Sequence, residues 1–310
     1  YRYESPSKAK ESLIQSIDLA EKSNMDRLSV EGLNKFADFL SSRASYDSAI
    51  VEYNKAAALA EKVSYDQGLS EALLGLGITY MRKGNLKLAT QYLEENLKLV
   101  QEINDVEGEA NTYNNFGNIY NEQGEYTKAM ESYTMAYKKN AEIGNVRNMG
   151  IAMASIGLIH QKLENFQDAI NYFARSDSIF KDQEFLGGRA FVLKNMAIIY
   201  KNIQKYPESL QCSSEALEIY RKTGQLREIG QITHNIGNLY WEQDDYQTAL
   251  IYHKQAYEVD TQIGDSIGIA MASQAMAINY LSLNDPGMAL LYSKEALNIA
   301  SKLGIMLTVM

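Results

Sequence analysis

The stretch YNNFGNIYNEQGEYTKA, Tyr113 to Ala129, combines a helical pattern, a turn and an unusual number of asparagines. Tyr113, Phe116 and Tyr120 stand three and four positions apart, which is the spacing of a helix with one buried face. Gly124 interrupts the pattern, and a second apolar pattern begins after it. Four asparagines lie in the first predicted helix, although an asparagine costs roughly 0.5 kcal/mol relative to alanine in a helix interior. The stretch therefore predicts a helix–turn–helix unit whose polar face requires an explanation.

This unit recurs every 40 residues, and no insertion breaks the register. The tyrosine column consists of Leu40, Tyr80, Tyr120, His160, Tyr200, Tyr240 and Tyr280. The small-residue column consists of Ala37, Gly77, Gly117, Gly157, Ala197, Gly237 and Ala277. The alanine column consists of Ala9, Ala49, Ala89, Ala129, Ala169, Ser209, Ala249 and Ala289. Self-similarity at a fixed period predicts a solenoid in which each repeat contributes two helices.

The turns carry residues that tolerate the left-handed conformation with which many helices end. Within the repeats we predict this role for Gly84, Gly124, Asn165, Asp245 and Asn284. Between the repeats we predict it for Asn104, Gly144, Gly224, Gly264 and Gly304. Asp105, Asn145 and Asp265 follow three of these turns and are predicted N-caps of the next helix.

The small-residue column predicts where the two helices of a repeat approach most closely. Ala197 and Ala277 occupy the position that is glycine in other copies, so the position selects for small size and not for an unusual backbone angle. A large side chain there would overpack the contact between the helices.

Three segments resemble the tetratricopeptide repeat (TPR) family at its small-residue, tyrosine and alanine sites. They are LGLGITYMRKGNLKLA from Leu74, NFGNIYNEQGEYTKA from Asn115 and NIGNLYWEQDDYQTA from Asn235. The resemblance extends over essentially the whole chain and implies an all-α fold, an α-α superhelix of about seven to eight repeats. The 40-residue period resembles the long-repeat branch typified by kinesin light chain and the spindle-orientation adaptors.

We expect residues 1–310 to form a single superhelical domain that is part of a longer protein. The predicted elements are an isolated second helix at 5–22, repeats at 26–64, 65–104, 105–144, 145–184, 185–224, 225–264 and 265–304, and the start of a further helix at 305–310. Both terminal elements are incomplete repeats, and the chain does not begin with methionine.

Composition excludes several function classes. A net charge of -9 without a basic run argues against a nucleic-acid partner. The longest apolar runs are too short to cross a membrane. We expect no metal or cofactor and no enzymatic activity, because His160, His234 and His253 lie in different predicted helices without ligand spacing. His160 is expected to be a packed histidine and Cys212 a buried, inert thiol. We predict a cytoplasmic location and leave a periplasmic or extracytoplasmic one open.

The family resemblance implies that the first helices line a concave groove. The candidate groove residues are Asn111, Asn114, Asn115, Asn118, Ile151, Phe191, Lys194, Asn195, Gln231, His234, Asn235, Asn238, Trp241, Met271 and Gln274. An asparagine amide offers a donor and an acceptor, which matches the backbone of an extended peptide. We favour ligand contact for Asn115, Asn195 and Asn235. For Asn114, Asn121 and Asn238, hydrogen bonding within the protein or to water remains an equal alternative.

Two functions follow from this interpretation. The first is a scaffold that binds a protein or peptide segment in the groove. The second is a sensory or regulatory input domain of a larger signalling protein, in which ligand binding changes the pitch of the repeat stack.

Overall fold

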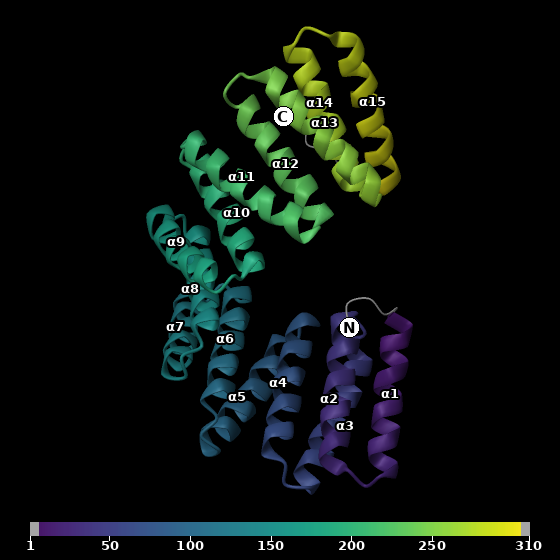
Figure 1. Cartoon of the computed structure of the whole chain (residues 1–310), viewed down its shortest axis with the longest axis vertical. Helices are drawn as coiled ribbons and strands as arrows, with labels where there is room; N and C mark the ends of the chain where they lie inside the picture. Colours follow the sequence, from purple (N-terminus) through teal and green to yellow (C-terminus); the bar gives the residue numbers. More distant parts are fainter. Residues whose placement is uncertain (1–5, 305–310) are drawn as a thin grey trace. The chain divides into compact units, whose positions relative to one another are not determined.

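The computed structural model describes residues 6–304, which form fifteen α-helices and no strand (Figure 1). The helices are α1 (Pro6–Lys22), α2 (Asp26–Ser42), α3 (Tyr46–Lys62), α4 (Asp66–Arg82), α5 (Leu86–Glu102), α6 (Val106–Glu122), α7 (Tyr126–Glu142), α8 (Val146–Lys162), α9 (Phe166–Asp182), α10 (Leu186–Asn202), α11 (Tyr206–Thr223), α12 (Leu226–Trp241), α13 (Tyr246–Ile263), α14 (Ser266–Ser282) and α15 (Pro286–Leu303). The predicted all-α repeat fold is confirmed. From α2 onward, even-numbered helices are the first and odd-numbered helices the second of each repeat.

The chain divides into two compact units, residues 1–159 and residues 160–310. The first unit contains α1 to α7 and most of α8, and the second contains the end of α8 and α9 to α15. Within each unit, a first helix packs against its own second helix and against the neighbouring repeat, as α2 does with α3 and α4. The organisation as one domain stays a prediction, and the further helix predicted at 305–310 lies outside the described residues.

A left-handed residue ends each described helix, at every twentieth position from Asn24 to Gly304. The predictions for ten turns are confirmed in eight and wrong by one residue in two. Within the repeats at 145–184 and 225–264, the left-handed residues are Glu164 and Asp244 and not the asparagine and aspartate that follow them. The strict period of the helices decides the position, although both residue types are less suited to it than glycine.

Asn165 and Asp245, which follow the left-handed residues Glu164 and Asp244, occupy the N-cap positions of α9 and α13. Asp245 accepts a hydrogen bond from the backbone N–H of Thr248. The predicted caps Asp105, Asn145 and Asp265 are all confirmed, because the side-chain oxygen of each accepts a backbone N–H from the first turn of the next helix.

The small residues lie where the paired helices touch, as predicted. A Cβ atom added to Gly117 would stand 2.5 Å from the ring of Tyr133, and one added to Gly237 would stand 2.5 Å from the ring of His253. We call the side chain that faces the small residue the wedge. In the successive copies the wedge is Tyr53, Leu93, Tyr133, Phe173, Ser213, His253 or Ser293.

The contact between Gly237 and His253 predicts a stability effect. Gly237→Leu should lower the free energy of unfolding by about 1–3 kcal/mol, because the new side chain overlaps the buried wedge. Gly187 is the matched control, since an added Cβ there meets only Phe185, at 3.9 Å. Urea unfolding monitored by circular dichroism measures both variants. A Gly237→Leu variant as stable as Gly187→Leu would contradict the close contact.

Candidate functional site

Two asparagines of the first helices form a hydrogen bond with the wedge of their own repeat. Asn118 follows Gly117, and its Oδ1 accepts a hydrogen bond of 2.8 Å from the hydroxyl of buried Tyr133. At the same separation along the chain, Asn238 Oδ1 lies 3.2 Å from Nε2 of His253. A buried polar group that lost this partner would cost roughly 1–3 kcal/mol, so these two asparagines have a structural role.

The residue paired with the wedge varies with the wedge. Asp38 accepts a hydrogen bond from the hydroxyl of Tyr53 in the first complete repeat. In the next repeat the wedge is Leu93, which has no polar group, and the corresponding residue is Ile78. The tyrosine and histidine wedges thus have a polar partner, because a buried hydroxyl or ring nitrogen requires one.

His253 has a defined protonation state. It is 1% exposed, and its Nδ1 lies 2.8 Å from Nδ2 of Asn279, which can only donate. Nδ1 therefore accepts, and Nε2–H donates to Asn238. Burial lowers the pKa of His253 to about 3, and the neighbouring His234 contributes. The two imidazole rings lie 5.0 Å apart, a proximity that their positions in different helices did not suggest.

Asn115 and Asn195 use part of their hydrogen-bonding capacity within their own helices. Nδ2 of Asn115 donates to the backbone oxygen of Asn111, and Nδ2 of Asn195 donates to that of Phe191. Asn115 is half-buried, whereas Asn195 is only 8% exposed. Ligand contact by these two residues stays a prediction, and the burial of Asn195 leaves it outside the site described below.

A cavity of about 270 Å³ brings three candidate groove residues together in the second unit: Lys194, Asn235 and Asn238. Lys194, Ile198 and Lys201 form one face of α10 beside it. Further lining residues are Ala197, Asn202, Ser209, Ser213, Ile232 and Leu239. The cavity thus combines an apolar interior with amides and two cationic side chains.

The cavity exists because this repeat has a small wedge. Ser213 lies opposite Ala197, where the other copies within 26–264 have Tyr53, Leu93, Tyr133, Phe173 or His253. Ser209 also stands in the alanine column, and its hydroxyl donates to the backbone oxygen of Ala197. The volume that a large side chain fills elsewhere is therefore open to a ligand at this position.

Lys194 and Lys201 carry positive charge beside the cavity. Nζ of Lys201 lies 3.4 Å from a carboxylate oxygen of Glu242, which partly offsets its charge. Burial and the charge of Lys201 lower the pKa of His234 to about 4, so this imidazole is neutral near pH 7. Burial raises the pKa of Cys212 to about 11, and the thiol is buried and protonated as expected.

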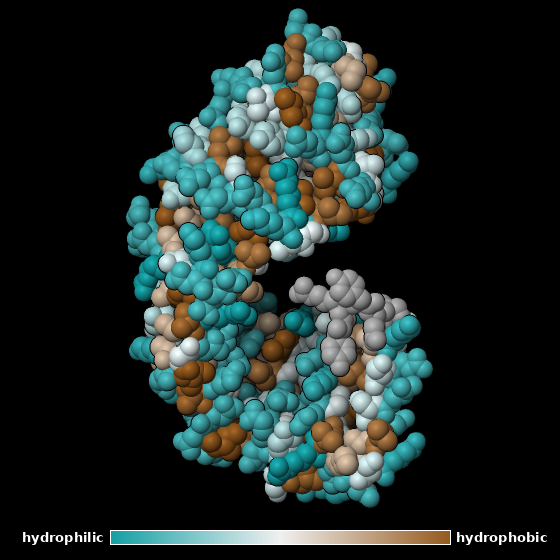
Figure 2. All heavy atoms as spheres, viewed as in Figure 1, coloured by the Kyte–Doolittle hydropathy of each residue, from teal (hydrophilic) through white to brown (hydrophobic). Residues whose placement is uncertain are grey.

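The other candidate groove residues lie outside this cavity. Asn111, Asn114 and Ile151 are half-buried in the first unit, and Gln274 is half-buried in the second. Phe191, Gln231, Trp241 and Met271 are exposed. On the face drawn in Figure 2, hydrophobic patches interrupt a mainly hydrophilic surface in both units. Exposure makes these residues available to a partner without showing that they bind one.

Eight of the eleven lining residues were not among the candidate groove residues, including Lys201, Asn202 and Ser213. A comparison of wedge positions among the copies would have identified Ser213, because it is the first small wedge in the series.

His160 is packed as predicted, with its ring stacked on Tyr172 at 5.3 Å between centroids. Within residues 6–304, no group of three or more His, Cys, Asp or Glu side chains is placed to hold a metal ion. The described helices include none that combines the length and apolar character needed to span a membrane.

A family model described as tetratricopeptide repeat matches residues 68–142, 188–262 and 228–302, which together cover more than half of the chain. The human SH3 domain and tetratricopeptide repeat-containing protein 2 is 27% identical over 136 residues. That match covers 44% of this chain, and the chain spans about a tenth of the length of this curated relative.

Two solved structures share the fold. One is a signal transduction ATPase with numerous domains from Pyrococcus horikoshii that has a tetratricopeptide repeat sensor, with a TM-score of 0.76 and 14% identity over 98% of this chain and 49% of that chain. The other is a Rap protein complexed with competence and sporulation factor, with a TM-score of 0.60 and 14% identity over 95% of this chain and 85% of that chain. These comparisons do not confirm the narrower resemblance to kinesin light chain and the spindle-orientation adaptors.

The buried imidazole predicts that acid destabilises the second unit. The pKa of His253 is about 3 when folded and 6.5 in the reference state, so its neutral form contributes stability above pH 6.5 that is lost as the pH falls toward 3. Between pH 6.5 and pH 5 the loss is about 2 kcal/mol. His253→Tyr places the wedge of Tyr133 beside Asn238, and this share of the acid sensitivity should disappear.

Urea unfolding of both proteins at pH 7.5 and pH 5 measures the effect. The variant keeps His234, whose pKa is also lowered, so part of the pH dependence of its stability should remain. An identical loss of stability in the wild type and in His253→Tyr would show that His253 is not the responsible group.

Proposed function

Because the chain belongs to the tetratricopeptide repeat family, we propose that it is a protein-interaction scaffold that binds an extended segment of a partner at the Ser213 cavity. The observation that carries this proposal is the open wedge position, where an apolar volume lies directly beside amides and cationic groups. Apolar pockets with a few polar groups are the usual form of ligand sites. A partner side chain would fill the space that Tyr133 fills within another copy.

The polar groups around the cavity favour a partner with an acidic residue. Lys194 and Lys201 supply positive charge, and Asn235 and Asn238 add amides. The oxygen of Asn238 is engaged by His253, so its N–H groups are the remaining donors for an incoming carbonyl or carboxylate. We therefore propose an apolar side chain next to an aspartate or glutamate as the recognised feature.

The spacing of the repeats suits an extended ligand. Packed helices lie about 8–10 Å apart, and an extended strand advances about 3.3 Å per residue. A segment that places one side chain in the cavity beside α10 would continue toward α12, which lines the same cavity. In this proposal, Asn235 on α12 would contact the segment there.

A regulatory input role is the second candidate. It is favoured by the similarity to the structure that contains a tetratricopeptide repeat sensor, since that match extends over 98% of this chain. The similarity to a Rap protein complexed with competence and sporulation factor agrees with a ligand-dependent role. Both candidates require a binding site on the repeats, and they differ in whether binding changes the activity of an attached module.

Filling the cavity tests the proposal. A fluorescent 12-residue peptide selected from a random library against the wild type serves as the probe, and its affinity is measured by fluorescence polarisation. Ser213→Tyr should weaken binding at least tenfold, because its ring fills the cavity. Ile198 offers the new hydroxyl no acceptor, unlike Asp38 beside Tyr53, so the melting temperature is measured alongside the affinity. Lys194→Gln should weaken it about threefold or more, and the selected peptides should be rich in acidic residues.

The neighbouring residue provides the matched control. Ser214 is exposed on the same helix, so Ser214→Tyr adds the same ring outside the cavity and should leave the affinity unchanged. Equal binding by the wild type and by Ser213→Tyr, or a library selection without acidic residues, would contradict the proposal.

A further inference from the structure

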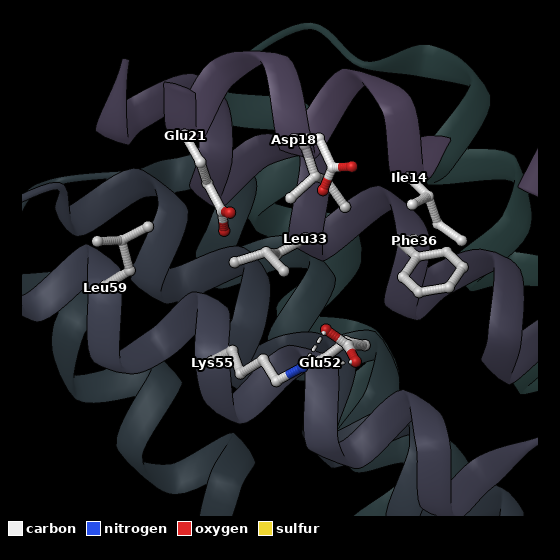
Figure 3. Close-up of a pocket in the computed structure, with 9 residues that line it drawn as sticks. Ile14, Asp18, Glu21, Leu33, Phe36, Glu52, Lys55 and Leu59 are labelled. Atoms are coloured by element: carbon white, nitrogen blue, oxygen red, sulfur yellow. Dashed lines mark hydrogen bonds and ion pairs between the residues drawn. The ribbon is translucent and has the colours of Figure 1, made fainter. Parts of the chain in front are cut away.

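A second cavity, of about 450 Å³, lies in the first unit among α1, α2 and α3 (Figure 3). Figure 3 shows Asp18 and Glu21 of α1 on one side of the space and the pair of Glu52 and Lys55 of α3 on the other. Leu33 of α2 stands between them. Because α1 and α3 are both second helices, this cavity is distinct from the one beside the first helices α10 and α12.

The cavity lies where this repeat lacks aromatic side chains that other copies have. Glu52 stands at the position of Tyr92, Tyr172, Tyr252 and Tyr292, and each of these rings stacks on the tyrosine column within its own repeat. Ile17 stands at the position of Tyr257, whose hydroxyl donates to Glu295 near the other end of the chain. Ser132 and Cys212 occupy the position of Glu52 in the remaining copies, so among the second helices α3 to α15 a carboxylate stands there only in this repeat.

The lining has an apolar interior and an excess of negative charge. Ile17 and Leu33 are buried, and Phe36 and Leu59 are partly buried against them. The Glu52 side chain is 16% exposed and forms an ion pair of 2.9 Å with Lys55, the one cation among the lining residues. Two further carboxylates therefore face a cavity whose single cation already has a partner.

We propose that this cavity binds an arginine side chain of a partner protein, as an interaction surface separate from the Ser213 cavity. The methylene groups of the arginine would cover Leu33 and Leu59, and its guanidinium would lie between Asp18 and Glu21. Arginine fits better than lysine because its planar guanidinium can donate to two carboxylates and also stack on the ring of Phe36. Opposite charge across such an interface also accelerates association.

The chemistry of the cavity is tested with n-butylguanidinium, which carries the cation and stem of arginine. Binding is followed through the methyl NMR signals of Ile14, Ile17, Leu33 and Leu59. We expect saturable shifts at these methyls, with n-butylguanidinium binding at least threefold more tightly than n-butylammonium, and no saturable binding of 1-pentanol. Equal binding of 1-pentanol would reveal an apolar cavity without charge recognition and would overturn the proposal, as would the absence of shifts.

Variants assign the effect to the named groups. Asp18→Asn combined with Glu21→Gln should weaken n-butylguanidinium binding at least tenfold, because both carboxylates are removed without a change in size. Glu61 occupies the place of Glu21 one repeat later, so Glu61→Gln is the matched control and should bind as the wild type does. Unchanged affinity in the double variant would refute recognition by these carboxylates.

The partner itself is addressed with a peptide library and the Ser213→Tyr protein, in which the first cavity is closed. Counter-selection against the Asp18→Asn, Glu21→Gln form of that protein removes peptides that bind elsewhere. The selected peptides should contain an arginine next to apolar residues, and n-butylguanidinium should displace them. Enrichment of peptides without arginine, or failure of n-butylguanidinium to displace the selected peptides, would contradict this proposal. The proposal for the Ser213 cavity would not be affected by either result.

Discussion

The contact between a small residue and its wedge fixes how the two helices of each repeat pack. Gly117 and Gly237 admit the rings of Tyr133 and His253 to within a distance that even one added carbon would violate. Interiors of proteins are packed too densely to absorb such a change without movement of the helices. The 40-residue period can therefore persist along the chain while the wedge varies, provided that each wedge and its surroundings remain compatible.

The wedge also explains part of the polar surface of the first helices. Asn118 and Asn238 are present because Tyr133 and His253 each bring a polar atom into the interior. The cost of an asparagine in a helix is smaller than the cost of an unsatisfied buried group, so the exchange is favourable. Asparagine at these positions is consequently explained by a hydrogen bond to the core, and it indicates a binding groove only where it has no such partner.

Local features of the fold could be predicted from the sequence with little ambiguity. Helices, N-caps and most turns depend on residues within a few positions of one another, and comparing the internal copies averages out exceptions. The turns at Glu164 and Asp244 were misplaced by one residue because the period of the helices outweighs the intrinsic preference of the residue. Sequence reasoning places the asparagine or aspartate that follows in the left-handed position, whereas the structure uses it as the N-cap residue.

The site could be predicted only in part, because burial depends on the rotation of each helix and on side chains from other elements. Lys194, Asn235 and Asn238 line one cavity, and their role in binding stays a prediction, whereas Asn195, in the same column as Asn235, is buried. The cavity depends on Ser213, which lies on a different helix and was not among the predicted residues.

Both cavities arise by the same physical route. Ser213 replaces a large wedge in one repeat, and Glu52 replaces a stacked tyrosine in another, so each repeat keeps its backbone geometry but lacks a ring. The lost apolar contacts reduce the stability of that repeat, since a cavity forgoes dispersion and burial that the other copies retain. In the proposed complexes, a partner side chain that enters a cavity would recover these contacts. The lysines beside the first cavity would favour an acidic neighbour, and the carboxylates at the second would favour a cation. In a protein of similar units, a substitution at one wedge position can thus change the interior of one repeat while the packing of the remaining repeats is preserved.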